Sequence, residues 1–396
     1  MLAVNKRSAV IHAGFALTGV VTTLLGPIIP ALSASWSLND AQAGYLFTAQ
    51  FGGSITGVVL TTQLTGRLGY VRLLVVGFLM MCIGVGALGV SAYPAGIVSV
   101  LCYGVGLGIT IPTANLFVSD LNPQRRAASL NLLNFAWCIG AVVSPPIIAI
   151  LVRNASAREA LIGLSLILGI TALALVKLLR ASLVVGALQP RKHDSRAPAR
   201  LWTSPFVPLI AALIFIYVGT ENAIAGWVAS YALRMKGSAE SLWSLAPSIF
   251  WAALLMGRVT APGALRQVRE ERLVLLGLAT ASLGASILLL SAGMTGLLTG
   301  VALAGAGLAP VFPTTIALLS HCFGGQAPRV ASLVFAFAGL GGATLPWLVG
   351  WISSHYGGLR VGLGVPVSCT LTMIGLQIAI IVILNRQPRA LAASDA

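Results

Sequence analysis

Long apolar runs alternate with short polar segments along the chain, and the runs set the expected fold. Each run is close to the roughly 20 residues that an α-helix needs to cross the hydrocarbon core of a bilayer. The runs cover about 8–32, 41–65, 72–92, 95–119, 127–152, 159–180, 204–233, 240–259, 272–292, 296–320, 329–353 and 359–385. Twelve runs of this length predict an all-α polytopic membrane protein with twelve transmembrane helices.

The longest polar segment, at about 182–202, divides the runs into two sets of six. It carries four basic residues and one acidic residue, Asp194. We therefore expect an N-terminal six-helix bundle at 1–181, a cytoplasmic linker at 182–202, and a C-terminal six-helix bundle with a short cytoplasmic tail at 203–396.

The two halves also repeat each other in sequence. The segment GVGLGITIPT at 104–113 matches GAGLAPVFPT at 305–314, and Gly66-Arg67 matches Gly257-Arg258 at the end of an earlier run. Two six-helix repeats that enclose a site near the bilayer midplane are typical of secondary transporters. We therefore expect two pseudo-symmetric bundles around a central cavity.

The composition supports a membrane protein and argues against a nucleic-acid-binding one. Of the 396 residues, 57% are hydrophobic and 8% are charged, whereas a soluble globular chain carries about 25% charged residues. The formal net charge of +15 comes from bases in short loops between apolar runs, as membrane topology requires. The expected partners are a lipid bilayer and a small-molecule substrate, with no nucleic acid.

The distribution of bases predicts how the chain crosses the membrane. If the N-terminus is cytoplasmic, 19 of the 24 Lys and Arg residues fall on the cytoplasmic side and 5 on the other side. This asymmetry follows the positive-inside rule. We expect a multi-pass protein of the cell inner (plasma) membrane, monomeric, with both termini in the cytoplasm.

Neither an enzyme nor a metal protein is expected. The five cysteines are scattered singly, and the four histidines have no carboxylate or thiol at ligand spacing. The chain has no Walker A motif and no Ser/His/Asp constellation. We predict no cofactor and no metal, with a proton as the coupling ion.

One acidic residue stands out because of where it lies. Glu221 is in the middle of the apolar segment LIFIYVGTENAIAGWVASYAL, and of nine acidic residues it is the one placed deep in hydrocarbon. Such a group is costly unless it is protonated, paired or hydrated, and it marks a functional site by default. We predict proton coupling at Glu221. The alternative is a protonated side chain that hydrogen-bonds a neighbouring helix.

Further substrate-binding candidates lie on the same predicted helix. Tyr217 is one turn before Glu221, Asn222 follows it, and Trp227 and Tyr231 form a second pair one turn apart. An indole ring can stack on a sugar ring and still offer an N–H donor. Packing between helices is the alternative role for these aromatic residues.

Three amides in the first half are also candidate substrate ligands. Gln50 lies in the second run, and Asn131 and Asn134 lie in the fifth. Amides both donate and accept hydrogen bonds, which suits hydroxyl-rich ligands. Hydrogen bonding between helices is the alternative.

Two repeated Gly-Arg pairs are candidate gating residues. Gly66 and Arg67 end one predicted helix, and Gly257 and Arg258 end its counterpart. Cations at helix C-termini can bind carbonyl groups and nearby carboxylates, which would hold the cytoplasmic side closed. The alternative is that these bases only mark topology.

These features together resemble the major facilitator superfamily over nearly the full chain. The segment LTGRLGYVR at 64–72 is similar in part to that family's loop 2–3 signature, G-x-L-A-D-R-x-G-R-K: Arg67 and Gly69 are kept, but Gly66 stands in place of the usual Asp. The resemblance implies the major facilitator fold and alternating access. In that family the Asp is the acidic partner in the contacts that close the cytoplasmic side, so the resemblance also implies that this partner is missing here.

Within that superfamily, two segments resemble the fucose/galactose/glucose–proton symporter group. They are YVGTENAIAGWVASY at 217–231 and SLNLLNF at 129–135. The resemblance implies proton symport of a monosaccharide. The acids that fucose permease is thought to use in helices 1 and 4 have no counterpart here. We expect a neutral solute, because we place no Arg or Lys inside a span.

A proton-driven multidrug or metabolite efflux antiporter is the alternative function. Gly140-x-x-x-Ser144-Pro145 resembles the helix-5 antiporter motif, although Ser144 replaces its second Gly. Substrate identity, direction and stoichiometry are left open by the sequence.

Overall fold

The computed structural model describes residues 2–122, 124–182, 206–235 and 243–386. Nearly all of the predicted linker at 182–202 lies outside these residues. The first half contains α1 Leu2–Thr22, α2 Leu25–Trp36, α3 Asp40–Leu68, α4 Tyr70–Leu88, α5 Tyr93–Leu121, α6 Arg126–Asn154 and α7 Ala157–Ser182. The second half contains α8 Phe206–Arg234, α9 Leu245–Ala264, α10 Glu270–Leu290, α11 Met294–Leu308, α12 Val311–Phe323, α13 Ala327–His355, α14 Leu359–Gly362 and α15 Gly364–Arg386, with a 3-10 turn at Gly324–Gln326.

The helices correspond to the twelve predicted spans, so the all-α prediction is confirmed. Nine helical spans in the described residues are long and apolar enough to cross a membrane, one of them made of α11 and α12 and another of α14 and α15. Helices α1 and α2 together form a tenth span, which is bent by 45°. The two remaining spans are α3 and α9, which carry Gln50 and Arg258 respectively. These two more polar helices lie at the junction between the halves.

The bend between α1 and α2 follows from local sequence. Pro27 has no backbone N–H, so the carbonyl of Thr23 cannot receive its usual helical hydrogen bond. The chain breaks between Thr22 and Leu25, and the Thr23 hydroxyl donates back to the carbonyl of Gly19 at 3.0 Å. Gln50 of α3 donates from Nε2 to the carbonyl of Thr22 at 3.0 Å. The break therefore places polar backbone next to the centre of the protein.

Glycines allow close helix packing in both halves, which explains the sequence repeat. A Cβ at Gly57 of α3 would collide with the backbone of α5, and one at Gly108 of α5 would collide with the backbone of α3. In the second half, a Cβ at Gly305 of α11 would collide with the carbonyl of Phe250 in α9. Small residues at such contacts let membrane helices approach closely.

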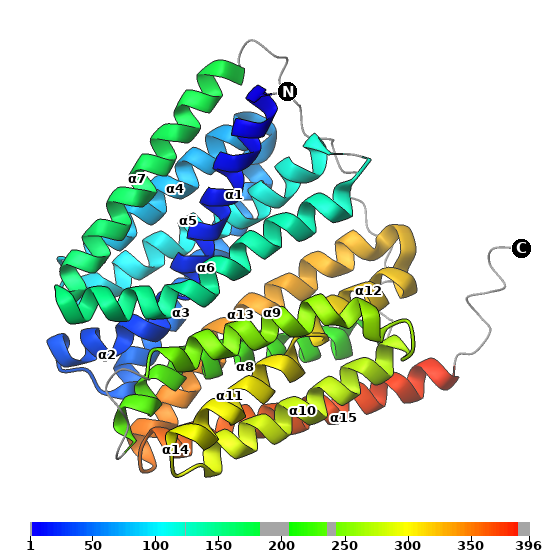
Figure 1. Ribbon diagram of the computed structural model, residues 1–396. Coiled ribbons are helices and arrows are strands. Elements are labelled where there is room, and N and C mark those ends of the chain that lie inside the picture. The colour runs from blue at the N-terminus through cyan, green and yellow to red at the C-terminus, as the bar shows by residue number, and fades with distance from the viewer. Residues whose placement is uncertain (1, 123, 183–205, 236–242, 387–396) are drawn as a thin grey trace, which may run out of the picture.

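The two bundles meet at one end and diverge toward the other (Figure 1). Following the positive-inside prediction, we name the ends outer and inner, with Asp40 at the outer end and Arg67 at the inner end. Hydrogen bonds that involve Asp40, Ala41 and Thr48, all in the first third of α3, join the two halves at the outer end. The molecule is therefore closed at its outer end.

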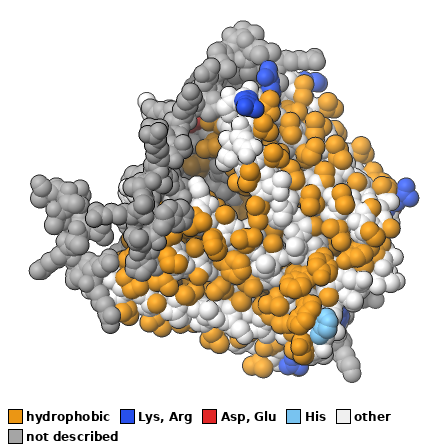
Figure 2. Space-filling view, turned by 180° about the vertical axis from the view of Figure 1, so that it is seen from behind, with side chains coloured by type: hydrophobic (Ala, Val, Ile, Leu, Met, Phe, Trp, Pro, Cys, Tyr) orange, Lys and Arg blue, Asp and Glu red, His pale blue; other side chains and the backbone are white. Residues whose placement is uncertain are grey.

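The outer circumference of the molecule is apolar. Figure 2 shows hydrophobic side chains spread over one broad face, with Lys and Arg mainly at its margins. Large exposed residues occur in both halves, among them Ile83, Leu166, Leu283 and Leu290. Exposed apolar surface of this extent marks an interaction surface, and on helices of this length that surface faces lipid.

Candidate transport site

Glu221 lies near the middle of α8 and is buried, with 8% of its surface exposed. The hydroxyl of Tyr217, one helical turn earlier, donates a hydrogen bond to Oε2 of Glu221. Tyr217 is itself 1% exposed and packs against Phe312, with ring centroids 5.9 Å apart. The sequence prediction that Tyr217 and Glu221 share one helix face is confirmed.

Arg258 lies beside Glu221, which corrects two expectations from the sequence. Its Nη2 is 3.6 Å from Oε2 of Glu221 and donates to the Tyr217 hydroxyl at 3.3 Å. Helix α9 continues to Ala264, six residues beyond Arg258, which places the residue about 9 Å from the helix end. Arg258 is therefore not at an inner helix end, and the expectation that no span contains a base is wrong.

The charged cluster touches both halves of the protein. The thiol of Cys138, on α6, interacts with the guanidinium of Arg258. Arg258 retains 30% of its side-chain surface exposed, whereas its Nε is buried and has no hydrogen-bond partner among the described residues. The α8–α9 charge pair of the second half therefore also contacts α6 of the first half.

A small cavity lies next to the cluster, on its outer side. It holds about 10 Å³, which is room for about one water molecule. It is lined by Thr22, Thr23, Leu25, Gly26, Phe47, Gln50, Asn222, Ala225, Gly226 and Trp251. Two predicted substrate ligands, Gln50 and Asn222, thus meet across the halves. The space is too small for a sugar in this conformation.

Gln50 and Asn222 are both engaged in hydrogen bonds. Gln50 accepts from the Tyr103 hydroxyl at 2.8 Å and donates to the Thr22 carbonyl. Asn222 donates from Nδ2 to the carbonyl of Val218 at 2.8 Å. Gln50 therefore also supports the broken helix, because it supplies a donor to a carbonyl at the break.

Trp227 does not line the cavity, contrary to the sequence prediction. It is fully buried, its Nε1 donates to the carbonyl of Pro346 at 2.8 Å, and its ring packs on Phe47. Trp251 lines the cavity instead, and its ring meets Trp137 of the other half edge-on at 5.6 Å. A sequence signal existed, because Trp251 is seven residues before Arg258 and so lies on the same helix face.

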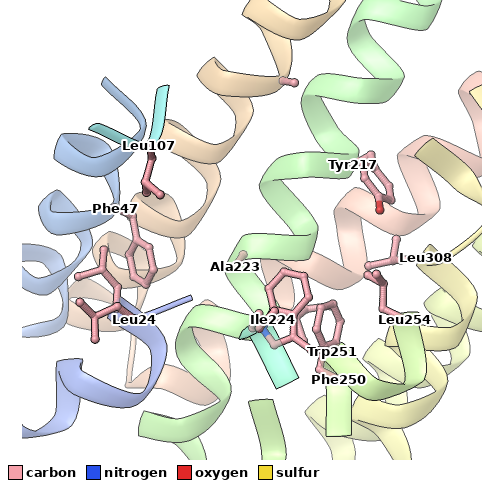
Figure 3. Close-up of a cluster of buried hydrophobic side chains, with 14 of the residues drawn as sticks. Leu24, Phe47, Leu107, Tyr217, Ala223, Ile224, Phe250, Trp251, Leu254 and Leu308 are labelled. Atoms are coloured by element: carbon pink, nitrogen blue, oxygen red, sulfur yellow. The ribbon is translucent and has the colours of Figure 1, made fainter. Parts of the chain in front are cut away.

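Buried aromatic and aliphatic side chains surround this region. Figure 3 shows Tyr217 of α8 together with Phe250, Trp251 and Leu254 of α9 and Leu308 of α11. A low-polarity surrounding of this kind strengthens electrostatic interactions at the Glu221–Arg258 pair. Tyr231, two to three turns further along α8, is also buried, at 6% exposed.

Asn131 and Asn134 lie on the inner side of the cluster and are exposed. They precede Cys138 by seven and four residues, so they share its helix face and lead from Arg258 toward the inner end of α6. Asn134 donates to its own helix at the carbonyl of Leu130, at 2.9 Å.

The predicted gating residues fall in three different environments. Gly66 and Arg67 are exposed, and among the described residues Arg67 makes no ion pair. Gly257 is a packing residue, since a Cβ there would strike Ala309 of the next helix. Three residues after Arg67, Tyr70 donates a hydrogen bond to Asp120 at 2.7 Å. Gating by Gly66 and Arg67 stays a prediction.

Two sugar transporters of known name match this chain, one over most of its length and one over less than half. A glucose/galactose transporter of Brucella abortus is 24% identical over 393 residues, covering 92% of this chain and 94% of the relative. The glucose/mannose transporter GlcP of Bacillus subtilis is 26% identical over 174 residues, covering 42% of this chain and 41% of the relative.

Solved structures confirm the fold. An inward-facing bacterial homologue of the human lysosomal transporter Spinster superposes with a TM-score of 0.77 at 12% identity, covering 96% of this chain and 97% of that one. FucP in its outward conformation gives a TM-score of 0.64 at 18% identity, covering 94% and 97%. The family model "Major Facilitator Superfamily" matches residues 11–296. The chain belongs to the major facilitator superfamily of membrane transporters.

Proposed function

We propose that this protein is a secondary active transporter that moves a monosaccharide-class solute across the cytoplasmic membrane, with a proton coupled at Glu221. The named relative that matches 92% of the chain is a glucose/galactose transporter, which supports the solute class. The buried Glu221–Arg258 pair in contact with Cys138 of the other half is the observation that carries the coupling. The protein acts as a monomer with both termini in the cytoplasm.

Alternating access requires the outer end to open. That end is held by Arg234 of α8, which donates to both carboxylate oxygens of Asp40 at 2.7 and 2.6 Å, and by Ser353, which donates to Asp40 at 2.5 Å. Burial alone would raise the pKa of Asp40, but the hydrogen bonds from Arg234 and Ser353 and the charge of Arg234 outweigh it and lower that pKa. Asp40 therefore stays ionised, and the contact persists, at neutral pH.

Coupling follows from the change in charge at Glu221. The ionised carboxylate attracts Arg258 and accepts the Tyr217 hydrogen bond. A proton on Glu221 removes that attraction and releases the guanidinium, which also contacts α6. Proton binding therefore changes the contacts between α8, α9 and α6, and the energy difference between the inward-open and outward-open states changes with it.

Proton flux in reconstituted vesicles tests the proposal. Purified protein in liposomes that enclose a pH-sensitive dye should acidify the lumen when D-glucose or another monosaccharide is added outside. Glu221→Gln should abolish sugar-driven proton entry, because the amide cannot carry a proton. The exposed Glu159→Gln, which keeps its hydrogen-bond geometry with Ser156, is the matched control and should retain flux.

Two results would contradict the proposal. Unaltered coupling in Glu221→Gln would remove that residue from the mechanism. Proton-driven extrusion of accumulated cationic dye would favour the efflux function instead. The segment that suggested efflux is occupied in packing, since a Cβ at Gly140 would collide with the carbonyl of Ala16 and Ser144 donates to the carbonyl of Val20 at 3.2 Å.

A further inference from the structure

We infer that the solute carries one negative charge, as a hydroxylated carboxylate of the aldonate or uronate type, and that Arg258 binds its carboxylate once Glu221 is protonated. This inference rests on the proposed function, because it concerns the cargo of the same site. It replaces the neutral solute that the sequence suggested, since that expectation depended on the absence of a base inside the spans.

The first observation is that the donors of Arg258 are incompletely used. Its closest acidic contact is 3.6 Å, longer than the roughly 2.7–2.9 Å of a charge-assisted hydrogen bond. Its Nε–H is buried without an acceptor among the described residues. The outer Arg234 differs, because two of its nitrogens donate to Asp40 at 2.6 and 2.7 Å. A carboxylate would supply Arg258 with the acceptors that a paired arginine normally has.

The second observation is the charge balance at the site. The titratable groups that face the Glu221–Arg258 pair are Tyr217 of α8 and Cys138 of α6, and both are neutral in their protonated forms. Among the described residues, no second carboxylate approaches Arg258. The resting pair is therefore neutral, and a proton on Glu221 leaves one buried positive charge without a counter-charge.

Neutral and anionic solutes differ in whether they neutralise that positive charge. A neutral sugar with a proton leaves the guanidinium uncompensated in a low-dielectric interior, which is strongly unfavourable. A monoanion with a proton restores a net charge of zero at the site. The loaded and empty carriers then carry equal charge, so either can change conformation without moving a net charge through the membrane.

The surroundings of Arg258 suit the rest of such a solute. Arg258 is 30% exposed, and Asn131 and Asn134 are exposed on α6, on the helix face of Cys138 and nearer the inner end. Asn222 and Gln50 face the small outer cavity on the other side of the cluster. Amides on both sides of a guanidinium match a chain or ring of hydroxyls that ends in a carboxylate.

Matched pairs of solutes test the inference. D-glucose would be compared with D-gluconate and, separately, with D-glucuronate. Each solute is added to proteoliposomes that enclose a pH dye, with the membrane potential set by potassium and valinomycin. We expect the acids to drive proton entry at least about tenfold faster than glucose, the ratio that one lost charge contact commonly produces. Their initial rates should not change between zero and about −100 mV, because no net charge crosses.

The possible results separate this inference from the proposed function. Proton entry driven by D-glucose but not by the acids, and accelerated by an inside-negative potential, would overturn the anionic solute and leave the proposed function intact. No proton entry with any of the solutes, in vesicles where the protein is folded, would overturn both. Protein-free liposomes correct for passive entry of the undissociated acids.

Equilibrium binding of D-gluconate gives a second measurement that does not need transport. Wild-type affinity should rise as pH falls, by at most about tenfold per pH unit, because one proton is taken up with the anion. Glu221→Gln should bind D-gluconate with little pH dependence. The double variant Glu221→Gln/Arg258→Gln, which leaves no unpaired charge, should lose that binding, and its thermal unfolding shows whether it is folded.

Arg153→Gln is the control for charge alone, because Arg153 is an exposed base at the end of α6. It should bind D-gluconate like the wild type. Retained gluconate binding in the folded double variant would overturn the assignment of Arg258 as the carboxylate ligand.

Discussion

Arg67 and Arg258 occupy equivalent places in the sequence repeat but very different places in the molecule. Arg67 is the penultimate residue of α3, exposed, and without an ion pair among the described residues. Arg258 is inside α9, 3.6 Å from a buried carboxylate. The preceding glycines differ as well, since a Cβ at Gly66 would meet no atom within 4 Å whereas one at Gly257 would strike Ala309.

The difference arises from where each helix ends. Gly69 has a φ of 73°, a left-handed conformation that glycine adopts easily, and it ends α3 two residues after Arg67. None of the four residues that follow Arg258 is a glycine, and α9 continues through Pro262 to Ala264. Equal sequence motifs therefore give one base at the membrane surface and one base in the interior, where its energy depends on a partner.

The largest expected effect comes from removing the buried base. Arg258→Gln leaves the Glu221 carboxylate buried without its cation, and the loss of one partner from such a pair costs about 3 kcal/mol or more in stability. Arg67→Gln should change stability by less than about 0.5 kcal/mol, as exposed substitutions usually do. Thermal unfolding in detergent measures both.

Adding Glu221→Gln to Arg258→Gln should recover most of the lost stability, because no unpaired charge remains. Equal losses of stability in Arg67→Gln and Arg258→Gln would contradict the difference in environment between the two bases.

A smaller effect should separate the two glycines. Gly257→Ala adds a methyl group against Ala309, and overpacking of this kind typically costs about 1–3 kcal/mol. Gly66→Ala enters open space within a helix and should be neutral or stabilise by up to about 1 kcal/mol. Unfolding midpoints of the two variants, measured side by side, decide this. A loss of stability in Gly66→Ala would mean that Gly66 has a packing role.

The smallest expected change in stability concerns Arg234, a base at a helix end that is paired with Asp40. Asp40→Asn removes the charge that Arg234 binds, and because the Arg234 side chain is half-exposed the ion pair is worth about 1 kcal/mol. The outer end should open more often. Ala225 is buried at the cavity, so labelling of Ala225→Cys by a membrane-impermeant maleimide, in a background without the five native cysteines, should become faster.

The pH dependence of this outer contact has a definite sign. The pKa of Asp40 is lowered in the folded protein, so its contribution to closure is present above the ordinary value of 3.8 and is lost as pH falls through the lowered value. Labelling at Ala225→Cys should therefore not respond to Asp40 between pH 5 and pH 8. A pH response in that window that disappears in Asp40→Asn would contradict this.

Much of the fold was predictable, because each helix crosses the same slab of hydrocarbon. The observed helix bounds differ from the predicted runs by a few residues, and the apolar runs alone indicated all twelve spans. The site was predictable only in part. Glu221 was identified by its cost in hydrocarbon, and Gln50 and Asn222 do line the cavity, but Trp227 was misjudged because a buried indole and a cavity indole look alike in sequence.

By itself, the sequence determined the membrane fold, the two repeats and the one buried acid, since each depends on local hydropathy and spacing. Only the tertiary structure decided what that acid meets. A shift of five residues in the end of α9, from the predicted 259 to Ala264, is within the uncertainty of any apolar run, yet it leaves the guanidinium-bearing residue about 9 Å inside the helix end. Electrostatic energy in a low-dielectric interior depends steeply on such distances, so the partner of Glu221, and with it the expected charge of the solute, follows from packing rather than from composition.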